Sequence, residues 1–375
     1  MLIYADNAAT TKISDSVLEK MLPFLQEQFG NASSQYSLGT KAKCAIEQAR
    51  QQVAMAIGAE PSEIVFTSGG SESNNWVLSS VNKGHVITSS IEHHSVLNSC
   101  HLLESKGVEV TYLPVDSKGR VSLNSIKGAI RSDTILVSIM LANNEIGTIQ
   151  PIAEIGRYLH GRSILFHTDA AQAVGHIPVN VKELGVDFLT ASSHKFNGAK
   201  GTGILYKRNG VSLPPLIFGG EQELGFRAGT ENVAGIVAAG YAITESVTIM
   251  NSIADKLSAF DQITINGIRA KIPNIIINGD DNNRLPGMIN IVFDGVTGES
   301  LMHFLDLHGI CVSTSSACTS GKDKPSHVLM AIGLSEQQAK SAIRISYGRY
   351  NNLDEVKTIV ATICKAYNKI LVVKP

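Results

Sequence analysis

The stretch Asp187-Phe-Leu-Thr-Ala-Ser-Ser-His-Lys195 has the pattern of a buried strand that leads directly into a lysine. Its apolar part, 188–191, is short and continuous, as in a strand that is covered on both faces. In open α/β sheets, ligands bind beyond the carboxyl ends of the strands, so we expect Lys195 near such a site. With the glycine-rich segment 197–201 behind it, Lys195 can form a Schiff base with a carbonyl cofactor. Taken alone, the same lysine would also fit a solvated loop.

Similar apolar runs recur on both sides of this strand, and helical patterns separate them. Helical periodicity is present at 14–28, 40–57 and 96–105. Continuous apolar strands between helices predict an α/β fold with a mostly parallel seven-stranded sheet covered by helices on both faces. The segments expected to form strands are 63–67, 85–88, 109–113, 134–141, 163–166, 188–191 and 203–206.

The pattern changes after Met250. Polar stretches such as 278–284 interrupt shorter strand and helix candidates, and the sequence closes with a helical pattern at 353–370. A chain of 375 residues is long enough for two domains. We therefore interpret residues 15–250 as a large domain, and residues 1–14 together with 251–375 as a smaller α+β domain.

The composition argues against several classes of protein. The formal net charge is −1 and no basic segment is present, so nucleic acid and membrane surfaces are not expected as direct partners. The N-terminus lacks the pattern of a signal peptide, and the longest apolar stretch, 233–243, is shorter than the roughly 20 residues that span a bilayer. Five cysteines without a CxxC pair predict neither a disulfide framework nor a metal site. We expect a soluble, cytoplasmic protein.

Three further strand ends carry polar residues. Asp169 follows the strand at 163–166, where its carboxylate can pair with the protonated nitrogen of a pyridine ring or can cap a helix. The cluster 143–147 follows the strand at 134–141 and would also fit a turn. The segment 67–73 places small residues ahead of a helix, which suits a phosphate group and equally a simple turn. It matches neither a Walker loop nor GxGxxG, so nucleotide binding is not indicated.

Together these residues resemble the cysteine desulfurases, within the class V aminotransferase family of fold-type I pyridoxal-phosphate (PLP) enzymes. The similarity extends over almost the whole chain, in a fixed order of motifs. These are Tyr4-Ala-Asp-Asn-Ala-Ala-Thr-Thr11, Phe29-Gly-Asn31, Thr67-Ser-Gly-Gly-Ser-Glu-Ser-Asn74, Glu92-His93, Asn143-Asn-Glu-Ile-Gly147, Asp169-Ala-Ala-Gln172, Ser192-Ser-His-Lys195, Gly219-Gly-Glu-Gln-Glu-Leu-Gly-Phe-Arg-Ala-Gly-Thr230, Ser315-Ser-Ala-Cys-Thr319 and Ile343-Arg-Ile-Ser346.

The resemblance implies PLP as the cofactor and gives roles to individual residues. Lys195 would carry the cofactor and move the proton at the substrate α-carbon. Asp169 would pair with the pyridinium nitrogen, and His93 would stack on the ring and take part in acid–base steps. The full implied cofactor-binding set is Gly70, Ser71, His93, Asn144, Asp169, Gln172, Ser192, His194, Lys195 and Thr230.

The same resemblance implies how substrate and partners bind. Arg344, with Asn31, would hold the carboxylate of L-cysteine, because a planar guanidinium suits a bidentate contact. Asn144 would lie near both the ring oxygen and the substrate. Thr230 would reach the cofactor phosphate of a neighbouring subunit, which makes a homodimer part of the site. A sulfur acceptor or scaffold protein is a further expected partner.

Cys318 separates the desulfurases from other members of the family. It lies in Ser313-Thr-Ser-Ser-Ala-Cys-Thr-Ser-Gly321, a run of small polar residues that predicts an exposed loop, whereas a structural thiol is usually buried. The resemblance makes Cys318 the residue that takes up sulfur as a persulfide, while substrate cysteine becomes alanine. Cys311, within the apolar segment 308–312, is expected to be a core residue.

The sequence departs from the usual family pattern at Ala32, Tyr36, Ser71 and Ser193, and its C-terminus is short, which leaves docking of a scaffold protein open. A selenocysteine lyase, another class V PLP enzyme, and a non-catalytic sulfur-relay or scaffold protein are the alternatives. Iron–sulfur cluster assembly is the expected destination of the sulfur, since it is the commonest for such enzymes. Transfer to tRNA, to cofactor synthesis or to DNA also fits.

Overall fold

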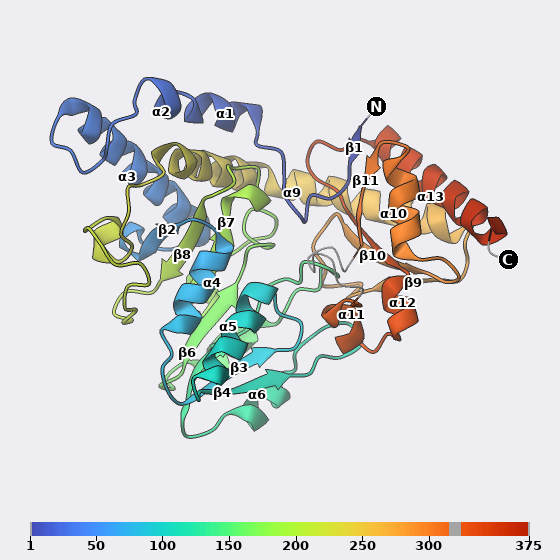
Figure 1. Ribbon diagram of the computed structural model, residues 1–375, viewed down its shortest axis with the longest axis horizontal. Helices are drawn as coiled ribbons and strands as arrows, with labels where there is room; N and C mark the ends of the chain where they lie inside the picture. Colours follow the sequence, from blue (N-terminus) through green and yellow to red (C-terminus); the bar gives the residue numbers. More distant parts are fainter. Residues whose placement is uncertain (1, 315–323, 374–375) are drawn as a thin grey trace.

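A seven-stranded sheet organises the larger part of the molecule, seen in a computed structural model that describes residues 2–314 and 324–373 (Figure 1). The strand order is β2-β8-β7-β6-β5-β3-β4. Only β8 runs antiparallel to its neighbours, β2 and β7, and the remaining pairs are parallel. The predicted fold class is confirmed. The strands are β2 Ile64–Thr67, β3 His85–Ser89, β4 Glu109–Leu113, β5 Thr134–Ser138, β6 Leu165–Asp169, β7 Phe188–Ser192 and β8 Gly203–Lys207.

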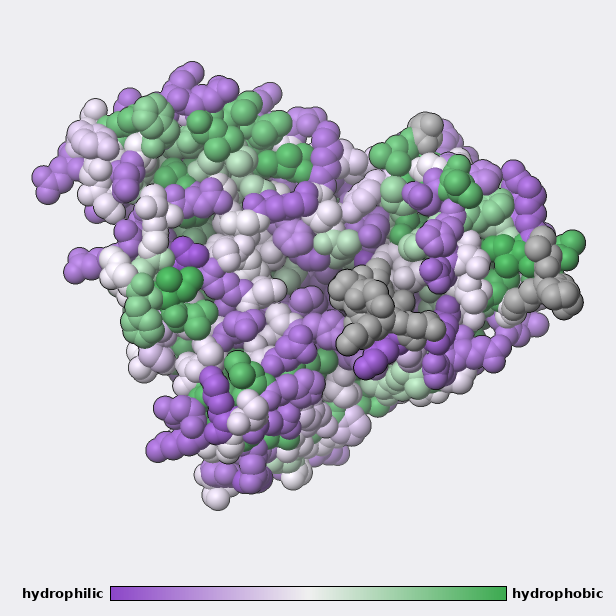
Figure 2. All heavy atoms as spheres, in the orientation of Figure 1, coloured by the Kyte–Doolittle hydropathy of each residue, from purple (hydrophilic) through white to green (hydrophobic). Residues whose placement is uncertain are grey.

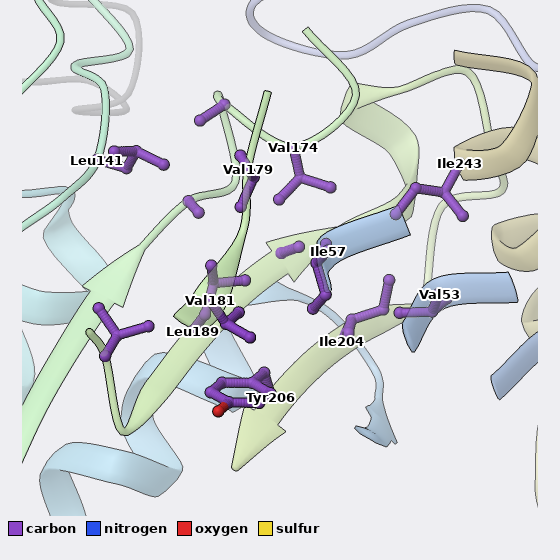
Figure 3. Close-up of a cluster of buried hydrophobic side chains, with 14 of the residues drawn as sticks. Val53, Ile57, Leu141, Val174, Val179, Val181, Leu189, Ile204, Tyr206 and Ile243 are labelled. Atoms are coloured by element: carbon purple, nitrogen blue, oxygen red, sulfur yellow. The ribbon is translucent and has the colours of Figure 1, made fainter. Parts of the chain in front are cut away.

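Alternate residues of the central strands pack into separate cores on the two faces of the sheet. Ile204 and Tyr206 of β8 join the core beneath the long helices, whereas Leu205 joins the core on the opposite face. Figure 3 shows Ile204, Tyr206 and Leu189 of β7 among side chains from the helices. Because both faces are covered, β5, β7 and β8 carry mostly apolar residues on both faces, which explains their nearly continuous apolar sequence pattern.

Different helices supply the two faces. Residues of α3, α7 and α9 build the core on one face, and residues of α4 and α5 build the core on the other. The helices of the larger part are α1 Asp15–Met21, α2 Pro23–Gln26, α3 Ser37–Ile57, α4 Gly70–Ser79, α5 His94–Ser105, α6 Leu123–Ala129, α7 Ile152–Leu159, α8 Val181–Leu184 and α9 Val233–Arg269, with short 3₁₀ turns at η1 Pro61–Glu63, η2 Ser193–Lys195 and η3 Glu223–Gly225.

A four-stranded antiparallel sheet of order β12-β13-β10-β9 organises the smaller part of the molecule. The N-terminal strand β1 pairs in parallel with β11 beside it, so the first residues of the chain lie against the last third (Figure 1). The surface is indented between the helices α1 to α3 and the helices α10 and α13 (Figure 2). The elements are β1 Ile3–Tyr4, β9 Ile275–Asn278, β10 Met288–Phe293, α10 Gly298–Asp306, β11 Ile310–Cys311, β12 Ser313–Thr314, α11 His327–Ala331, α12 Glu336–Lys340, β13 Ala342–Ser346 and α13 Leu353–Val373.

Helix α9 connects the two parts, and residues 250 and 251, the predicted domain boundary, lie within it. Ile236 and Ile243 near its start pack in the core of the large sheet, whereas Leu257 and Ile268 pack in the core of the smaller part. The division into domains stays a prediction. By length and composition α9 would suffice to cross a membrane, but 61% of its apolar window is buried inside the fold, as in a core helix of a soluble protein.

Local details differ from the sequence expectations at two places. The helix expected at 14–28 is divided at Leu22, because Pro23 has no N–H for the preceding turn and starts a new short helix. The strand expected at 134–141 ends already at Ser138. The amides of Ile139 and Leu141 nevertheless donate to the carbonyl oxygens of His167 and Asp169.

Candidate active site

A cavity of about 400 Å³ lies beyond the carboxyl ends of β5, β6 and β7, where the first turn of α4, strand β13 and the N-terminal segment also meet. Its size is within the range of small-molecule sites. Asp6, Asn74, Ser95 and Met140 contribute to its wall without having been assigned a role from the sequence. Ten predicted site residues line it: Gly70, Ser71, His93, Asn144, Asp169, Gln172, Ser192, His194, Lys195 and Arg344.

Lys195 ends the short 3₁₀ turn η2 that follows β7 directly. Its Nζ donates to the carbonyl oxygens of Ala8 and Ala9, at 2.6 and 2.9 Å. The backbone carbonyl of Lys195 lies 2.8 Å from Nε2 of the half-buried His176. The N-terminal segment therefore holds the amine in the cavity wall, and His176 contacts the backbone of the same residue.

Asp169 is the last residue of β6 and is 7% exposed. Its Oδ2 accepts from Asn74 Nδ2 at 2.7 Å, and its Oδ1 accepts from the amide of Ala171 at 3.0 Å. The next helix, α8, starts only at Val181 and has Asn180 as its N-cap. Asp169 therefore has its carboxylate at the cavity and does not cap a helix.

His93 is linked to Asp169 by a short chain of hydrogen bonds. Nδ1 of His93 lies 2.8 Å from Ser95 Oγ and accepts from the Ser95 amide. Asn74 Nδ2 donates both to Ser95 Oγ, at 2.8 Å, and to Asp169. Burial lowers the pKa of His93, and the negative charge of Asp169 offsets this only in part. His93 is therefore a neutral imidazole whose Nδ1 accepts a hydrogen bond, and such a ring is suited to stacking on a flat cofactor.

The first turn of α4 also lines the cavity. Gly70 and Ser71 start this helix, where backbone N–H groups have no helical partner and favour an anion. Ser192 and His194 approach from the end of β7. Burial, with the charges of Lys195 and Lys200, lowers the pKa of His194 to about 4.

A close approach of two strands supports this turn. A Cβ on Gly203 of β8 would lie 2.5 Å from the carbonyl carbon of Gly69, so only glycine allows β8 to pass so near. The turn ahead of α4 is thereby fixed against the sheet.

Arg344 enters the cavity from β13. Its guanidinium donates to Asp6 Oδ1 and to the carbonyl oxygen of Asn144, each at 2.7 Å. Arg344 Nε is buried and has no hydrogen-bond partner among residues 2–314 and 324–373. A buried donor without a partner is costly, and an acceptor such as a carboxylate would satisfy it.

Three predicted site residues are not among those that line the cavity. Thr230 and Asn31 are exposed, and Asn31 Oδ1 accepts from the amide of Ser33 at 2.9 Å. Cys318 lies outside the described residues. Ser313, two residues before that segment, does line the cavity. The roles of Thr230, Asn31 and Cys318 stay predictions.

Asn74 and Asp6 are the partners that the sequence reasoning did not assign. Both lie within quoted motifs, Asp6 in 4–11 and Asn74 in 67–74. Asn74 is one helical turn after Gly70, so its side chain lies on the same side of α4 as the phosphate turn. This spacing was a usable signal. The sequence around Asp6 contained no such signal, because its partner Arg344 is 338 residues away.

A buried acid, Glu92, lies behind His93. Its Oε1 accepts from Ser89 Oγ at 2.5 Å and from the Met140 amide at 3.0 Å, and burial raises its pKa from 4.5 to about 8. Glu145 and Asp261 are also buried, and burial raises the pKa of each to about 7. In the folded state these carboxyls therefore keep their protons at a pH where the unfolded chain has lost them.

We expect the contribution of these three carboxyls to the folding stability to fall as the pH rises from about 5 to 8, because each of them binds more protons in the folded state than in the unfolded state over this range. Glu92→Gln removes one of these titrations while preserving the shape of the side chain. A tenfold change in proton affinity corresponds to about 1.4 kcal/mol. The change in the free energy of unfolding between pH 5 and pH 8 should therefore differ between the two proteins by at least about 1 kcal/mol, with the smaller loss in Glu92→Gln. Urea unfolding of both proteins at pH 5 and pH 8 measures this difference. The same loss in both proteins would contradict the assignment, and any constant offset between them would not.

Comparison with known proteins agrees with this geometry. The family model described as aminotransferase class-V matches residues 3–359, so the chain belongs to this family. Within it, the chain belongs to the cysteine desulfurases. The chain is 48% identical to "Cysteine desulfurase IscS" of Dictyoglomus turgidum, over 100% of this chain and 96% of that protein.

Solved structures of similar proteins agree with this family membership. The structure of a "NIFS-LIKE PROTEIN" superposes with a TM-score of 0.93 at 39% identity, covering 98% of this chain and 100% of that one. "SspA in complex with cysteine" superposes with a TM-score of 0.83 at 40% identity, covering 93% and 100%.

Proposed function

We propose that this chain is a PLP-dependent cysteine desulfurase, which converts L-cysteine to L-alanine and transfers the sulfur to Cys318. The observation that carries the proposal is a single cavity lined by an amine, a buried carboxylate and a guanidinium, from Lys195, Asp169 and Arg344. The membership of the chain in the cysteine desulfurases supports the same reaction.

The cavity is lined by groups that match the reactive parts of PLP. Lys195 offers an amine for the aldehyde, Asp169 a carboxylate for the pyridinium nitrogen, and the start of α4 a set of N–H groups for the phosphate. His93, Asn144 and Gln172 also line the cavity. When bound there, PLP would withdraw electrons from the substrate α-carbon and so acidify its proton.

The chain's own residues would then bind the substrate and move protons. Arg344 would hold the carboxylate of L-cysteine, since its Nε is left for an acceptor by the described residues. Lys195 Nζ would take the proton from the α-carbon. Asp169, itself held by Asn74 and the Ala171 amide, would keep the ring nitrogen protonated.

Cys318 would complete the reaction. Its thiolate would attack the sulfur of the substrate, so that the substrate C–S bond breaks as an S–S bond forms. Proton return to the remaining carbon skeleton would release alanine, and Cys318 would hold the persulfide. Burial raises the pKa of the Cys100 thiol to about 12, and burial also raises the pKa of Cys311 and Cys364, so these three thiols are poor nucleophiles.

The proposal includes the partners and the setting of the reaction. Two chains would form a homodimer in which the exposed Thr230 reaches the cofactor phosphate of the neighbouring subunit. Asn31 would help to bind the substrate there. The protein would act in the cytoplasm, where a sulfur acceptor or scaffold protein of iron–sulfur cluster assembly would receive the persulfide sulfur. A relative of known structure was solved in complex with cysteine, which supports L-cysteine as the substrate.

The test is to incubate the PLP-loaded protein with L-cysteine and a thiol reductant, and to quantify alanine and sulfide. We expect both products in equal amounts and at the same rate. Alanine formation from cysteine sulfinate or selenocysteine at a far higher kcat/KM would assign the protein to a related lyase. A protein that stays colourless after reconstitution with PLP would contradict the proposal.

A further inference from the structure

The segment between β8 and α9, residues 208–232, folds back on itself before it reaches Thr230. The amide of Ala228 donates to the carbonyl oxygen of Ile217 at 3.4 Å, and the amide of Gly229 donates to Gln222 Oε1 at 3.1 Å. Ala228 is buried, whereas Thr230 is exposed. The position of Thr230 therefore depends on the turn that follows Gln222.

That turn has an unusual backbone. Glu223, Leu224 and Gly225 have φ values of 50°, 59° and 80° in succession. Glycine accepts such angles, but residues with a Cβ adopt them at a steric cost, and two of these three residues have a Cβ. Such a conformation persists only where surrounding contacts hold it.

The carboxylate of Glu223 provides these contacts. It accepts from both terminal nitrogens of Arg50, at 2.8 and 2.9 Å, and from the amide of Phe66 at 2.8 Å. The side chains of Arg50 and Glu223 are only 4% and 3% exposed. A bidentate pair in a dry environment has a narrow range of geometries, so it fixes the direction of the turn.

Arg50 is itself held in place on α3. Its guanidinium donates to the carbonyl oxygen of Ile64 at 2.7 Å and lies 5.1 Å from the centre of the Phe66 ring. Ile64 and Phe66 belong to β2. The turn at 223–225 is therefore attached through Arg50 to the edge of the large sheet.

A second ion pair ties the far side of the turn to the helix that starts the phosphate site. Arg227 donates to both carboxylate oxygens of Glu72, at 2.9 and 3.1 Å, and Glu72 also accepts from the amide of Ser68. Arg227 is three residues before Thr230. The segment is thus held on both sides of the strained turn.

We propose that Glu223, supported by Arg227, is a positioning residue that presents Thr230 to the cofactor phosphate site of a second copy of the chain. This inference rests on the proposed dimeric active site. It adds that the buried Arg50–Glu223 pair of one chain sets the cofactor affinity of the other. The left-hand edge of the molecule, where this segment lies, carries a group of apolar atoms (Figure 2), and Phe218 and Leu224 of the segment are 83% and 63% exposed.

Mixed dimers distinguish an effect within one chain from an effect on the partner. One chain carries Lys195→Ala, so that only the site of the other chain can give the visible absorption of lysine-bound PLP. Glu223→Gln is then placed either on the Lys195→Ala chain, which lends its Thr230 to the reporting site, or on the reporting chain. The quantity measured is the PLP dissociation constant of the reporting site, by titration of the apo-dimer.

We expect the dissociation constant to rise about tenfold or more when Glu223→Gln is on the Lys195→Ala chain, because a small displacement of a contacting group weakens its interaction strongly. It should stay unchanged when the substitution is on the reporting chain. An effect that follows the reporting chain, or that is absent in both arrangements, overturns the inference.

Three further variants make each outcome decisive. Thr230→Ala on the Lys195→Ala chain tests the proposed dimeric site itself. If this variant leaves the PLP affinity unchanged, the shared site is wrong. If it weakens PLP binding while Glu223→Gln does not, only the inference about Glu223 fails.

Two other variants test the turn itself. Leu224→Gly tolerates the φ of 59° and should partly restore the PLP affinity that Glu223→Gln loses. If Glu223→Gln does not fold, Arg227→Lys keeps the charge but loses the bidentate contact, and it should give the same dependence on the chain that carries it.

Discussion

Replacing Lys195 with alanine is expected to abolish cysteine turnover and to remove the visible absorption of the PLP-loaded protein. Lys195 would both carry the cofactor and move the proton at the substrate α-carbon. Acid–base catalysis alone contributes about 10² to 10⁴ in rate, so we expect a loss of at least about four orders of magnitude in kcat. Absorption spectra after reconstitution with PLP, together with alanine release from L-cysteine, measure both effects.

Lys200→Ala is the matched control for this substitution. Lys200 is exposed, lies five residues further along the same loop and is the smallest of the three causes that lower the pKa of His194, so its loss should leave the spectrum and the rate nearly unchanged. Lys195→Ala also removes the hydrogen bonds from Nζ to Ala8 and Ala9, and unfolding curves of the apo-proteins will show whether the fold is retained. Substantial turnover in a well-folded Lys195→Ala protein would refute the assigned role.

Replacing Cys318 with alanine is expected to abolish cysteine desulfuration while leaving cofactor binding intact. The substituted protein should keep its visible absorption, and addition of L-cysteine should still change the spectrum, because Lys195, Asp169 and Arg344 are untouched. Sulfide and alanine production should fall by about two orders of magnitude or more, as for loss of an essential nucleophile. This combination separates sulfur transfer from cofactor chemistry, since Lys195→Ala should eliminate both.

Mass spectrometry of the protein after a single turnover should find the extra sulfur on the peptide that contains Cys318. Cys44 is the exposed thiol among the described cysteines, so Cys44→Ala is the control for non-specific persulfide formation and should retain full activity. Extra sulfur on Cys44 with normal alanine release would identify a different acceptor. Retained alanine production in Cys318→Ala would favour a class V enzyme that does not transfer sulfur to the protein.

Asn74 connects two residues of the site through hydrogen bonds. His93 and Asp169 were predicted separately, one to stack on the ring and one to pair with its nitrogen. Asn74 donates to Asp169 and to Ser95, whose hydroxyl contacts His93, so the two groups belong to one hydrogen-bonded chain. Their positions relative to each other are therefore fixed before any ligand binds.

Much of the site was predictable because each of its parts is local. A strand that ends in Lys195, a strand that ends near Asp169 and a small-residue turn ahead of a helix all produce patterns within about ten residues. In a mostly parallel sheet the carboxyl ends meet at one edge, so three separate patterns imply one site. The break of the helix at Pro23 has a local cause, the missing N–H of proline, and could have been predicted from the sequence, whereas the end of β5 depends on hydrogen bonds to the neighbouring strand.

The sequence by itself determined the class of protein, the strand ends that supply Lys195, Asp169 and Gly70, and the importance of Cys318, which still depends on the sequence alone. Only the tertiary structure decided which charged groups become partners. Asp6 meets Arg344 and Arg50 meets Glu223 across 338 and 173 residues, and no local periodicity records such contacts. The physical reason is that burial removes these charges from water, so each must find its partner wherever the fold brings one within hydrogen-bonding distance.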